Sequence, residues 1–157
     1  GTAGTAQQAA DIYNGKLTNW KELGGTDAPI TLYTREDGSG TRETFEERAL
    51  DKGTSAPSAN VVNSNGAMKT AIAQDKNAIG YVGLGYLAPS IKGLHIGKVA
   101  ASAETALSKE WPLSRELYVF TNGEPAGASG ALIKYILDPA KGQKAVKEVG
   151  FVPLAKK

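Results

Sequence analysis

The sequence predicts an α/β fold with a largely parallel sheet. Short segments with the alternating apolar pattern of strands recur between longer segments with helical apolar spacing. Capping residues and glycines stand where these helices would begin and end. A regular alternation of strands and helices is typical of a parallel sheet covered by helices. The chain has 157 residues, which is enough for one domain with its own hydrophobic core.

The first half of the chain is predicted to contain four helices and one strand. Thr5 and Gln8 form a capping-box pattern at the first helix, and Gly15 is placed to end it. Ile30 and Leu32 alternate with polar neighbours, as expected for a half-buried strand. The predicted segments are the helices AADIYNG (9–15), LTNWKELGG (17–25, capped by Thr18), 41–51 and 66–75, and the strand PITLYT (29–34).

The second half is predicted to contain three strands and three helices. The helix ASGALIKYILD is amphipathic, and Leu132, Ile133 and Ile136 are expected to face inward. The last helix is expected to begin at Asp138 as N-cap and to stop at Gly150. The predicted segments are the strands in 78–87, 94–100 and 116–121, and the helices 101–110, 128–138 and 138–150.

The composition is that of an ordinary globular protein and excludes several classes. The net charge is only +2, which by itself indicates neither a nucleic acid nor a membrane surface as partner. The chain has no cysteine, so disulfides and cysteine-based metal sites are excluded. No run approaches the roughly 20 apolar residues of a membrane span. No leader opens the chain, so we expect any signal peptide to be absent from it.

The stretch TREDGSGTRETFE joins a predicted strand to a predicted helix and concentrates groups that bind anions. The start of a helix offers unpaired N–H groups and the positive end of the helix dipole. Gly38 and Gly40 let the backbone approach a ligand, and Ser39 and Thr41 add hydroxyls. Arg35 adds a planar fork that matches oxyanions. The stretch therefore predicts an oxyanion site beyond the carboxyl end of the strand.

Asp37 is the acidic member of this stretch, and two roles are open for it. It either pairs with Arg35 and holds the guanidinium, or it accepts a hydrogen bond from a protonated oxyanion. A second interpretation of the whole stretch is purely structural: a glycine-rich turn with a serine N-cap and a solvent-exposed arginine. A nucleotide P-loop is excluded because Thr41 stands where that motif has lysine. The serine lies directly between two glycines, which excludes the G-x-S-x-G elbow of serine hydrolases.

Five blocks of the chain carry a family resemblance. They are IYNGKLTNWKELGG, PITLYTREDGSGTRETFEE, VVNSNGAMKTAIAQDKNAIGYVGLGYL, WPLSRELYVFTNGEP and ALIKYILDPAKGQKAVKEVGFVPL. In these blocks the chain resembles the phosphate-binding proteins of bacterial and archaeal phosphate ABC transporters. The blocks follow the family's order and cover nearly the whole chain, from about Ala10 to Leu154. REDGSGTRETF is the most specific of the shared motifs.

The resemblance implies a type II periplasmic-binding-protein fold, in which two α/β lobes close on phosphate. For this chain it implies a single lobe, a three-layer sandwich with a mostly parallel sheet. Carried over from the family, Arg35, Ser39, Gly40 and Thr41 would contact phosphate, and Asp37 would pair with Arg35. The family also implies an ABC permease as partner, no cofactor, and a periplasmic or extracellular location, with or without a lipid anchor.

The front of the chain departs from the family pattern. Family members normally carry most of a first lobe and an incoming hinge strand before this region, whereas residues 1–6, GTAGTA, look like a linker or a cloning remnant. We therefore expect a truncated, engineered or separately expressed lobe with half a phosphate site. Residues 7–157 would form one lobe, with a core over 7–110 and a return hinge and terminal helices over 111–157.

The return segment has two possible arrangements. In the first, residues 116–121 and the last helices fold back and add an antiparallel edge strand to the lobe's own sheet. In the second, residues 115–154 are exchanged with a second chain in a homodimer, because the missing hinge strand leaves an edge unpaired. The sequence does not decide between them.

Other polar residues receive weaker predictions. Ser64 and Asn65 precede the helix at 66–75, which borders the cleft in the family, and they either cap this helix or contact the ligand. Arg42 is expected to be a surface or inter-lobe charge. His95 is the only histidine and has no carboxylate partner in the sequence, so no metal site is expected.

Three functions remain open at this stage. The first is weak binding of inorganic phosphate by the lobe of a transport receptor. The second is a phosphatase or phosphotransferase that uses the same loop, although no nucleophile with a base and no HExxH pattern is found. The third is an engineered lobe without functional ligand binding.

Overall fold

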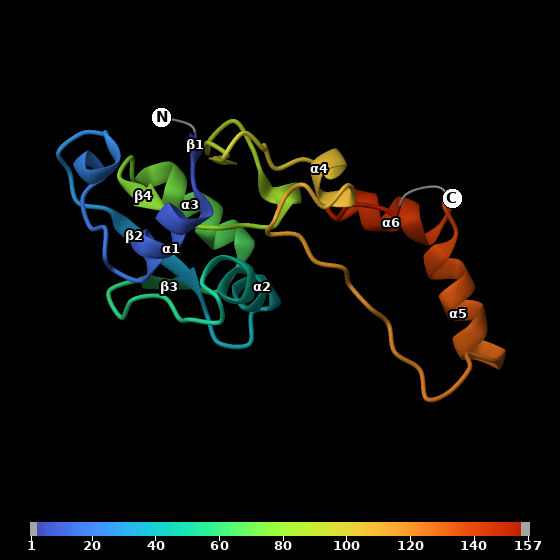
Figure 1. The fold of residues 1–157 in the computed structure, drawn as a ribbon. Helices are drawn as coiled ribbons and strands as arrows, with labels where there is room; N and C mark the ends of the chain where they lie inside the picture. Colours follow the sequence, from blue (N-terminus) through green and yellow to red (C-terminus); the bar gives the residue numbers. More distant parts are fainter. Residues whose placement is uncertain (1–2, 155–157) are drawn as a thin grey trace. The chain divides into compact units, whose positions relative to one another are not determined.

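The computed structural model describes residues 3–154 and divides into two compact units (Figure 1). The first unit is Gly1–Ser114 and the second is Arg115–Lys157. Among the described residues, both sheets and helices α1 to α4 belong to the first unit, and α5 and α6 belong to the second. No helix of the described residues is long and apolar enough to cross a membrane.

A parallel three-stranded sheet lies at the centre of the first unit. Its strands in spatial order are β3 (Asn60–Val62), β2 (Thr31–Arg35) and β4 (Ala78–Ile79). Arg35 lies opposite Val62 of β3, and Leu32 lies opposite Ile79 of β4. Since all three strands are parallel, their carboxyl ends lie at the same edge of the sheet.

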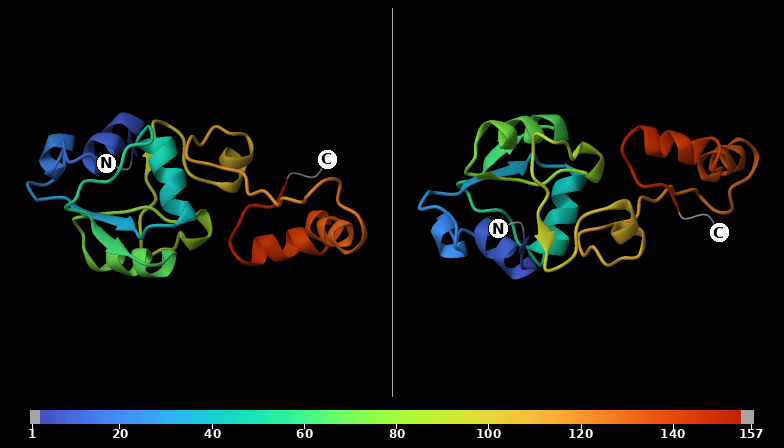
Figure 2. Two further views of the ribbon diagram at one scale, coloured as in Figure 1. Left: turned by 90° about the horizontal axis from the view of Figure 1, so that it is seen from below. Right: turned by 90° about the horizontal axis from the view of Figure 1, so that it is seen from above.

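Helices cover both faces of this sheet. Figure 2 shows α1 and α2 on one face of β2 and α3 on the other. The helical elements of the first unit are α1 (Ala6–Tyr13), η1 (Trp20–Leu23), α2 (Gly40–Ala49), α3 (Asn65–Gln74), η2 (Leu84–Tyr86) and α4 (Ala103–Leu107). The arrangement confirms the predicted α/β class and its parallel sheet with helices on the two faces.

The core lies mainly between the sheet and the helices α1 and α2. Its buried members are Ile12, Tyr13, Leu32, Phe45, Ala49, Leu50 and Ile79. The ring of Phe45 packs edge-on against Tyr13 at a centroid distance of 4.6 Å and stacks on Tyr81 at 4.2 Å. These rings therefore connect α1, α2 and the loop after β4, and they hold α2 against the end of β2.

Local capping explains where the first helices begin. The predicted capping box is present in α1, with Thr5 Oγ1 accepting from Gln8 N and Thr5 N donating to Gln8 Oε1. The predicted cap of the next helix is wrong: Asn19, not Thr18, caps the short 3₁₀ helix η1. Asn19 Oδ1 accepts from Lys21 N at 2.9 Å, a bond that closes a tight turn one residue later than expected.

The opening residues take part in the fold where the structure describes them. Ala3–Gly4 forms strand β1, which pairs in parallel with β5 (His95–Ile96) in a second, two-stranded sheet. The prediction of a linker over residues 1–6 is therefore wrong for residues 3–6: Ala3 and Gly4 form a strand, and Thr5 and Ala6 are the cap and the first residue of α1. Residues 1–2 lie outside the described residues. The parallel pairing with β5 connects the first strand to a segment more than ninety positions later in the chain.

Within residues 115–154, the described part of the second unit, there are two helices, α5 (Gly127–Leu137) and α6 (Gly142–Glu148). Gln143 is buried between them: its Nε2 donates to Ile136 O at 2.8 Å, and its Oε1 accepts from Leu154 N at 2.8 Å. This side chain ties the end of α5, the start of α6 and the segment after α6 into one unit.

Three predictions for this second unit are wrong. Residues 116–121 form no strand, and all strands within the described residues are paired in parallel, so the antiparallel edge strand is absent. Asp138 caps the end of α5, and its Oδ1 accepts from Ala140 N at 2.8 Å in a turn that delays α6. Leu132, expected to face inward, is 56% exposed.

Candidate anion-binding site

The candidate site lies at the carboxyl edge of the three-stranded sheet. β2 ends at Arg35, and α2 begins at Gly40, with four residues between them. β3 ends at Val62, and Ser64, the N-cap of α3, follows after a single residue. Glu36 N donates to Val62 O at 3.2 Å, which keeps the start of the loop aligned with β3. The fold thus places a strand end and two helix starts at one edge of the sheet, where open α/β sheets usually bind ligands.

Arg35 is the most unusual group at this edge because its guanidinium is buried. The side chain is only 9% exposed, and it donates from Nε to Glu36 Oε2 at 2.8 Å and from Nη2 to Glu36 Oε1 at 2.9 Å. Its third nitrogen, Nη1, is buried and has no hydrogen-bond partner among the described residues. A buried donor of a charged group without an acceptor costs free energy, so the geometry suits an additional anionic partner.

The pair of Arg35 and Glu36 also changes the acidity of both groups. The hydrogen bonds to Glu36 raise the pKa of Arg35 above its ordinary value, and burial opposes this shift. The hydrogen bond from Arg35 holds the pKa of the Glu36 carboxyl below its ordinary value. Arg35 is therefore fully cationic at neutral pH, with part of its fork neutralised by its neighbour.

We expect this pair to make the stability of the fold sensitive to acid. A carboxyl whose pKa is lower in the folded state adds stability above its unfolded pKa, and this stability is lost as the pH falls through the folded pKa. The ordinary pKa of Glu36 is 4.5, so the loss begins near that pH and continues below it. Urea unfolding measures the free energy of unfolding at about pH 7 and about pH 3. Its decrease between these two pH values should be smaller in Glu36→Gln than in the wild type. Glu43→Gln is the control, because it removes an exposed carboxyl of the same kind. If the decrease in Glu36→Gln is as large as in the wild type and in Glu43→Gln, the expectation is wrong.

The start of α2 supplies the neutral donors that the sequence predicts. Ser39 is buried and caps the helix, with its Oγ accepting from Arg42 N at 3.3 Å. The N–H groups of Gly40 and Thr41, the first two of the helix, have no acceptor within the helix. Gly38 has a φ of 81°, a left-handed conformation that glycine adopts without strain and that turns the chain from β2 into α2.

The predicted pairing of Asp37 with Arg35 is wrong. Asp37 Oδ1 instead accepts from Arg42 Nη1 at 2.7 Å, and its side chain is 98% exposed. Arg42 also donates to Glu46 Oε1 at 2.8 Å and to the carbonyl oxygen of Arg35 at 3.1 Å. Glu36, the neighbour of Arg35, reaches the guanidinium fork with both oxygens, and Asp37 pairs instead with Arg42 in the first turn of α2. Arg42 therefore braces the loop rather than lying free on the surface.

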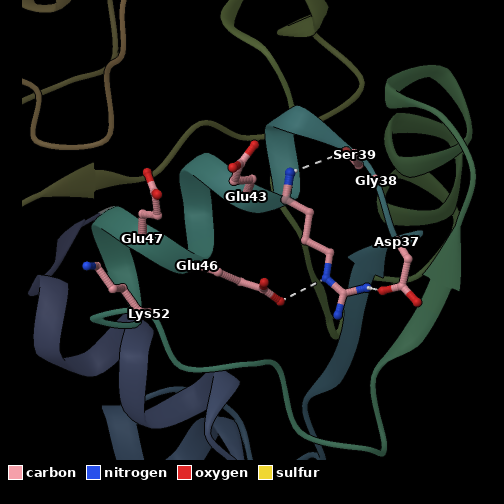
Figure 3. A pocket seen from close by; sticks show the side chains of 8 residues that line it. Asp37, Gly38, Ser39, Glu43, Glu46, Glu47 and Lys52 are labelled. Carbon is pink, nitrogen blue, oxygen red and sulfur yellow. Dashed lines mark hydrogen bonds and ion pairs between the residues drawn. The ribbon is translucent and has the colours of Figure 1, made fainter.

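The open pocket beside this loop does not suit an anion. It has a volume of about 500 Å³ and is lined by Asp37, Gly38, Ser39, Arg42, Glu43, Glu46, Glu47 and Lys52. Figure 3 shows Glu43, Glu46 and Glu47 along α2 and Asp37 across from them, with dashed lines joining Glu46 and Asp37 to one guanidinium. Carboxylates outnumber cations in this lining, and Arg35 is not part of it. We therefore place the anion site at Arg35 and the first N–H groups of α2.

Ser64 and Asn65 make structural hydrogen bonds. Ser64 Oγ accepts from Ala67 N at 3.0 Å as the cap of α3, and Asn65 Oδ1 accepts from Gly83 N at 3.0 Å. These bonds hold α3 against the loop after β4. A ligand contact for either residue stays a prediction.

Sequence reasoning missed two groups at this edge, Tyr81 and Ser55. The hydroxyl of Tyr81 accepts from Arg35 N at 3.1 Å and lies 2.8 Å from Thr34 Oγ1. Ser55 Oγ donates to Thr34 Oγ1 at 3.3 Å. Burial raises the pKa of the Tyr81 phenol above its ordinary value. No sequence motif predicts these contacts, because they join residues up to 47 positions apart in the chain.

Metal ligation has no support in the described part of the chain, where no group of three or more histidine, cysteine, aspartate or glutamate side chains could hold an ion. His95 lies in β5, in the sheet that it forms with β1.

Comparison with known proteins identifies the family. The model of the PBP superfamily domain matches residues 2–140, most of the chain. The chain belongs to the PBP superfamily. This PBP-superfamily chain is 35% identical to the phosphate-binding protein PstS of Bacillus subtilis over 144 residues, which are 91% of the chain and 48% of that protein. It is 34% identical to PstS of Pseudomonas aeruginosa, with 90% of the chain and 48% of that protein covered.

Solved structures of similar proteins share the fold. A structure from Clostridium perfringens, assigned as a phosphate ABC transporter substrate-binding protein with bound phosphate, matches with a TM-score of 0.84 and 34% identity, over 98% of this chain and 64% of that one. PstS from Borrelia burgdorferi matches with a TM-score of 0.76 and 31% identity, over 99% and 65% of the two chains. The resemblance to phosphate-binding proteins is thereby confirmed, and the PBP-superfamily chain spans about half the length of the curated relatives it matches.

Proposed function

We propose that the chain binds inorganic phosphate as one lobe of an extracytoplasmic receptor for phosphate ABC transport. The observation that carries the proposal is the buried guanidinium of Arg35, whose Nη1 has no partner among the described residues. A buried cationic donor is costly unless a ligand accepts from it. The relatives named above are phosphate-binding proteins, and the Clostridium perfringens neighbour holds phosphate, which supports phosphate as the anion.

The proposed ligand shell combines one cation with neutral donors. Arg35 supplies a charged N–H, Ser39 a hydroxyl, and Gly40 and Thr41 the first N–H groups of α2. Gly38 shapes the turn, while Ser64 and Asn65 are proposed as supporting residues at the adjacent start of α3. Because Asp37 is engaged with Arg42 at the exposed side of the loop, it is proposed to fix the loop rather than the guanidinium.

Binding is inferred to involve no covalent chemistry. The relatives are solute-binding proteins of transport, and Ser39, the nucleophile that a phosphatase would need, has its oxygen engaged as the cap of α2. Turnover of a phosphate ester that is lost in Ser39→Ala would contradict this inference.

Calorimetric titration of the 157-residue chain with phosphate tests the proposed function. A charge-assisted hydrogen bond contributes about 1.5–3 kcal/mol when buried and less when it stays in contact with water. Since one lobe supplies only part of a closed shell, we expect saturable binding weaker than about 1 μM. No binding at millimolar phosphate would contradict the function. Micromolar or tighter binding by a monomer would contradict the inference that one lobe supplies only part of the ligand shell.

The second unit is expected to associate with another copy of the chain. Phe120 is 89% exposed, and Leu117 and Val119 beside it are exposed as well in a segment without a strand partner. Unpaired apolar segments favour pairing with another chain, and exchange between identical chains is a low-cost route to a dimer. We expect light scattering to show a mass that rises from 16.4 kDa toward twice that value with concentration. If the wild type stays monomeric at all concentrations and Phe120→Lys behaves in the same way, the exchange is contradicted.

In the whole protein, we propose an ABC permease as the transport partner. We further propose a periplasmic or extracellular location, with or without a lipid anchor. Both proposals rest on the transport role of the relatives.

A further inference from the structure

Tyr81 contacts both elements that build the candidate anion site. It lies two residues after β4, and its hydroxyl accepts from Arg35 N at 3.1 Å and lies 2.8 Å from Thr34 Oγ1. Its ring stacks on Phe45 of α2 with a centroid distance of 4.2 Å and an angle of 11° between the rings. One side chain thus contacts the strand that carries Arg35 and the helix that offers its first N–H groups.

The hydroxyl of Tyr81 takes the position of a missing strand partner. The pairing of β2 with β4 covers only Thr31 and Leu32, because β4 ends at Ile79. On the other side, β3 stays paired with β2 as far as Arg35, and the next N–H, that of Glu36, donates to Val62 O. N–H groups alternate between the two sides of a strand, so the N–H of Arg35 points toward the β4 side of β2, beyond the point where β4 ends. There the phenol oxygen accepts from it.

We propose that Tyr81 is a positioning residue for phosphate binding, because its hydroxyl fixes the last peptide of β2 and thereby the direction of the Arg35 guanidinium. Tyr81 does not itself contact the anion. The hydrogen-bonded chain from Ser55 through Thr34 to Tyr81 keeps the phenol in place. The stacked ring couples this strand end to the start of α2, so that the charged and neutral donors keep one spacing. The inference rests on the proposed function, since it assigns a role within the same site.

Tyr13 provides a matched control for this proposal. It belongs to the same aromatic cluster, is buried, and its hydroxyl donates to Tyr33 O of β2 at 3.1 Å. Tyr13→Phe therefore removes one buried tyrosine hydroxyl bond to the same strand without touching Arg35. Tyr81→Phe removes the hydroxyl while it keeps the stacked ring. A purely structural role would make the two variants alike.

The experiment compares Tyr81→Phe and Tyr13→Phe by phosphate titration, by urea unfolding and by hydrogen exchange of the Arg35 amide. Loss of one hydrogen bond corresponds to about a threefold to tenfold change. We expect Tyr81→Phe to weaken phosphate binding by about that factor and to speed exchange of the Arg35 amide, while Tyr13→Phe changes binding by less than about twofold for a similar loss of stability. In an Arg35→Lys background, Tyr81→Phe should have no further effect on binding, because it acts through the guanidinium.

Several outcomes would overturn the proposal. Equal binding losses in the two phenylalanine variants, or an undiminished effect of Tyr81→Phe in the Arg35→Lys background, would show a general structural role. If the wild type binds no phosphate, the proposed function fails, and the Arg35 amide still decides the inference: unchanged exchange in Tyr81→Phe rejects it. If Tyr81→Phe does not fold, Thr34→Val, which removes the second partner of the phenol, should weaken binding in the same way, and unchanged affinity in that variant rejects the proposal.

Discussion

Replacing Arg35 with alanine is expected to abolish measurable phosphate binding by the chain. The buried guanidinium is the only cationic group that the structure places at the end of β2 with a donor free of partners among the described residues. Loss of the charged Nη1 donor, worth about 1.5–3 kcal/mol as a buried hydrogen bond, corresponds to up to about a hundredfold weaker binding. The starting affinity is itself expected to be weaker than about 1 μM. Titration followed by calorimetry or by NMR measures the loss. Arg35→Lys should retain part of the affinity, because lysine keeps the charge but not the planar fork.

Arg48→Ala is the matched control for this substitution. Arg48 lies in the last turn of the same helix α2 and is exposed, so its loss removes the same charge far from the first N–H groups. We expect its phosphate affinity to stay close to that of the wild type. If Arg48→Ala and Arg35→Ala lose binding to the same extent, the effect is one of overall charge, and the site at Arg35 is rejected.

Replacing Phe45 with alanine is expected to lower the free energy of unfolding by about 3–5 kcal/mol. Phe45 is buried in the core, packs edge-on against Tyr13 and stacks on Tyr81. The substitution removes a large apolar group and leaves a cavity between α2 and the sheet. Urea unfolding followed by circular dichroism measures the change. Because the stack also holds Tyr81, the remaining folded protein should bind phosphate more weakly.

Phe120→Ala offers the comparison for Phe45→Ala, since the two substitutions remove the same group. Phe120 is 89% exposed in the second unit and contributes little buried apolar area. At concentrations where the chain is monomeric, its replacement should change the free energy of unfolding by less than about 0.5 kcal/mol. A loss at Phe45 no larger than that at Phe120 would contradict the assignment of the core.

Much of the first unit could be predicted from the sequence because local signals agree with the final packing. The capping box of Thr5 and Gln8, the apolar alternation around Leu32 and the serine before Gly40 all act within a few residues. The strand expected over 116–121 is a different case. Its apolar pattern indicates a strand, but a strand forms only with a hydrogen-bonding partner, and the sequence does not tell which segment that partner is.

The start of α6 was misplaced for a related reason. Aspartate followed by proline is a common helix start, and the sequence offers that pair at Asp138. In the structure Asp138 ends α5, and the buried Gln143 fixes the turn between the two helices through contacts with Ile136 and Leu154. Such contacts depend on how the helices pack, which no local pattern records.

The candidate site could be predicted as far as one continuous motif reaches. Arg35, Ser39, Gly40 and Thr41 follow one another along a strand, a turn and a helix start, so their proximity follows from local structure. The partner of Arg35 was predicted as Asp37 but is Glu36, because the choice depends on which side chain reaches the fork. Tyr81 comes from a different strand loop and becomes visible only when β4 is placed beside β2.

The most direct test of the phosphate site is a titration of the ¹⁵N-labelled chain with phosphate followed by NMR. If phosphate binds where we propose, the amides of Gly40 and Thr41 and the side-chain Nε–H of Arg35 shift together and saturate with one affinity. Sulfate at the same concentrations serves to compare anions. Saturating shifts confined to residues such as Glu47 and Lys52, which line the acidic pocket, or no shift at Arg35 would contradict the account.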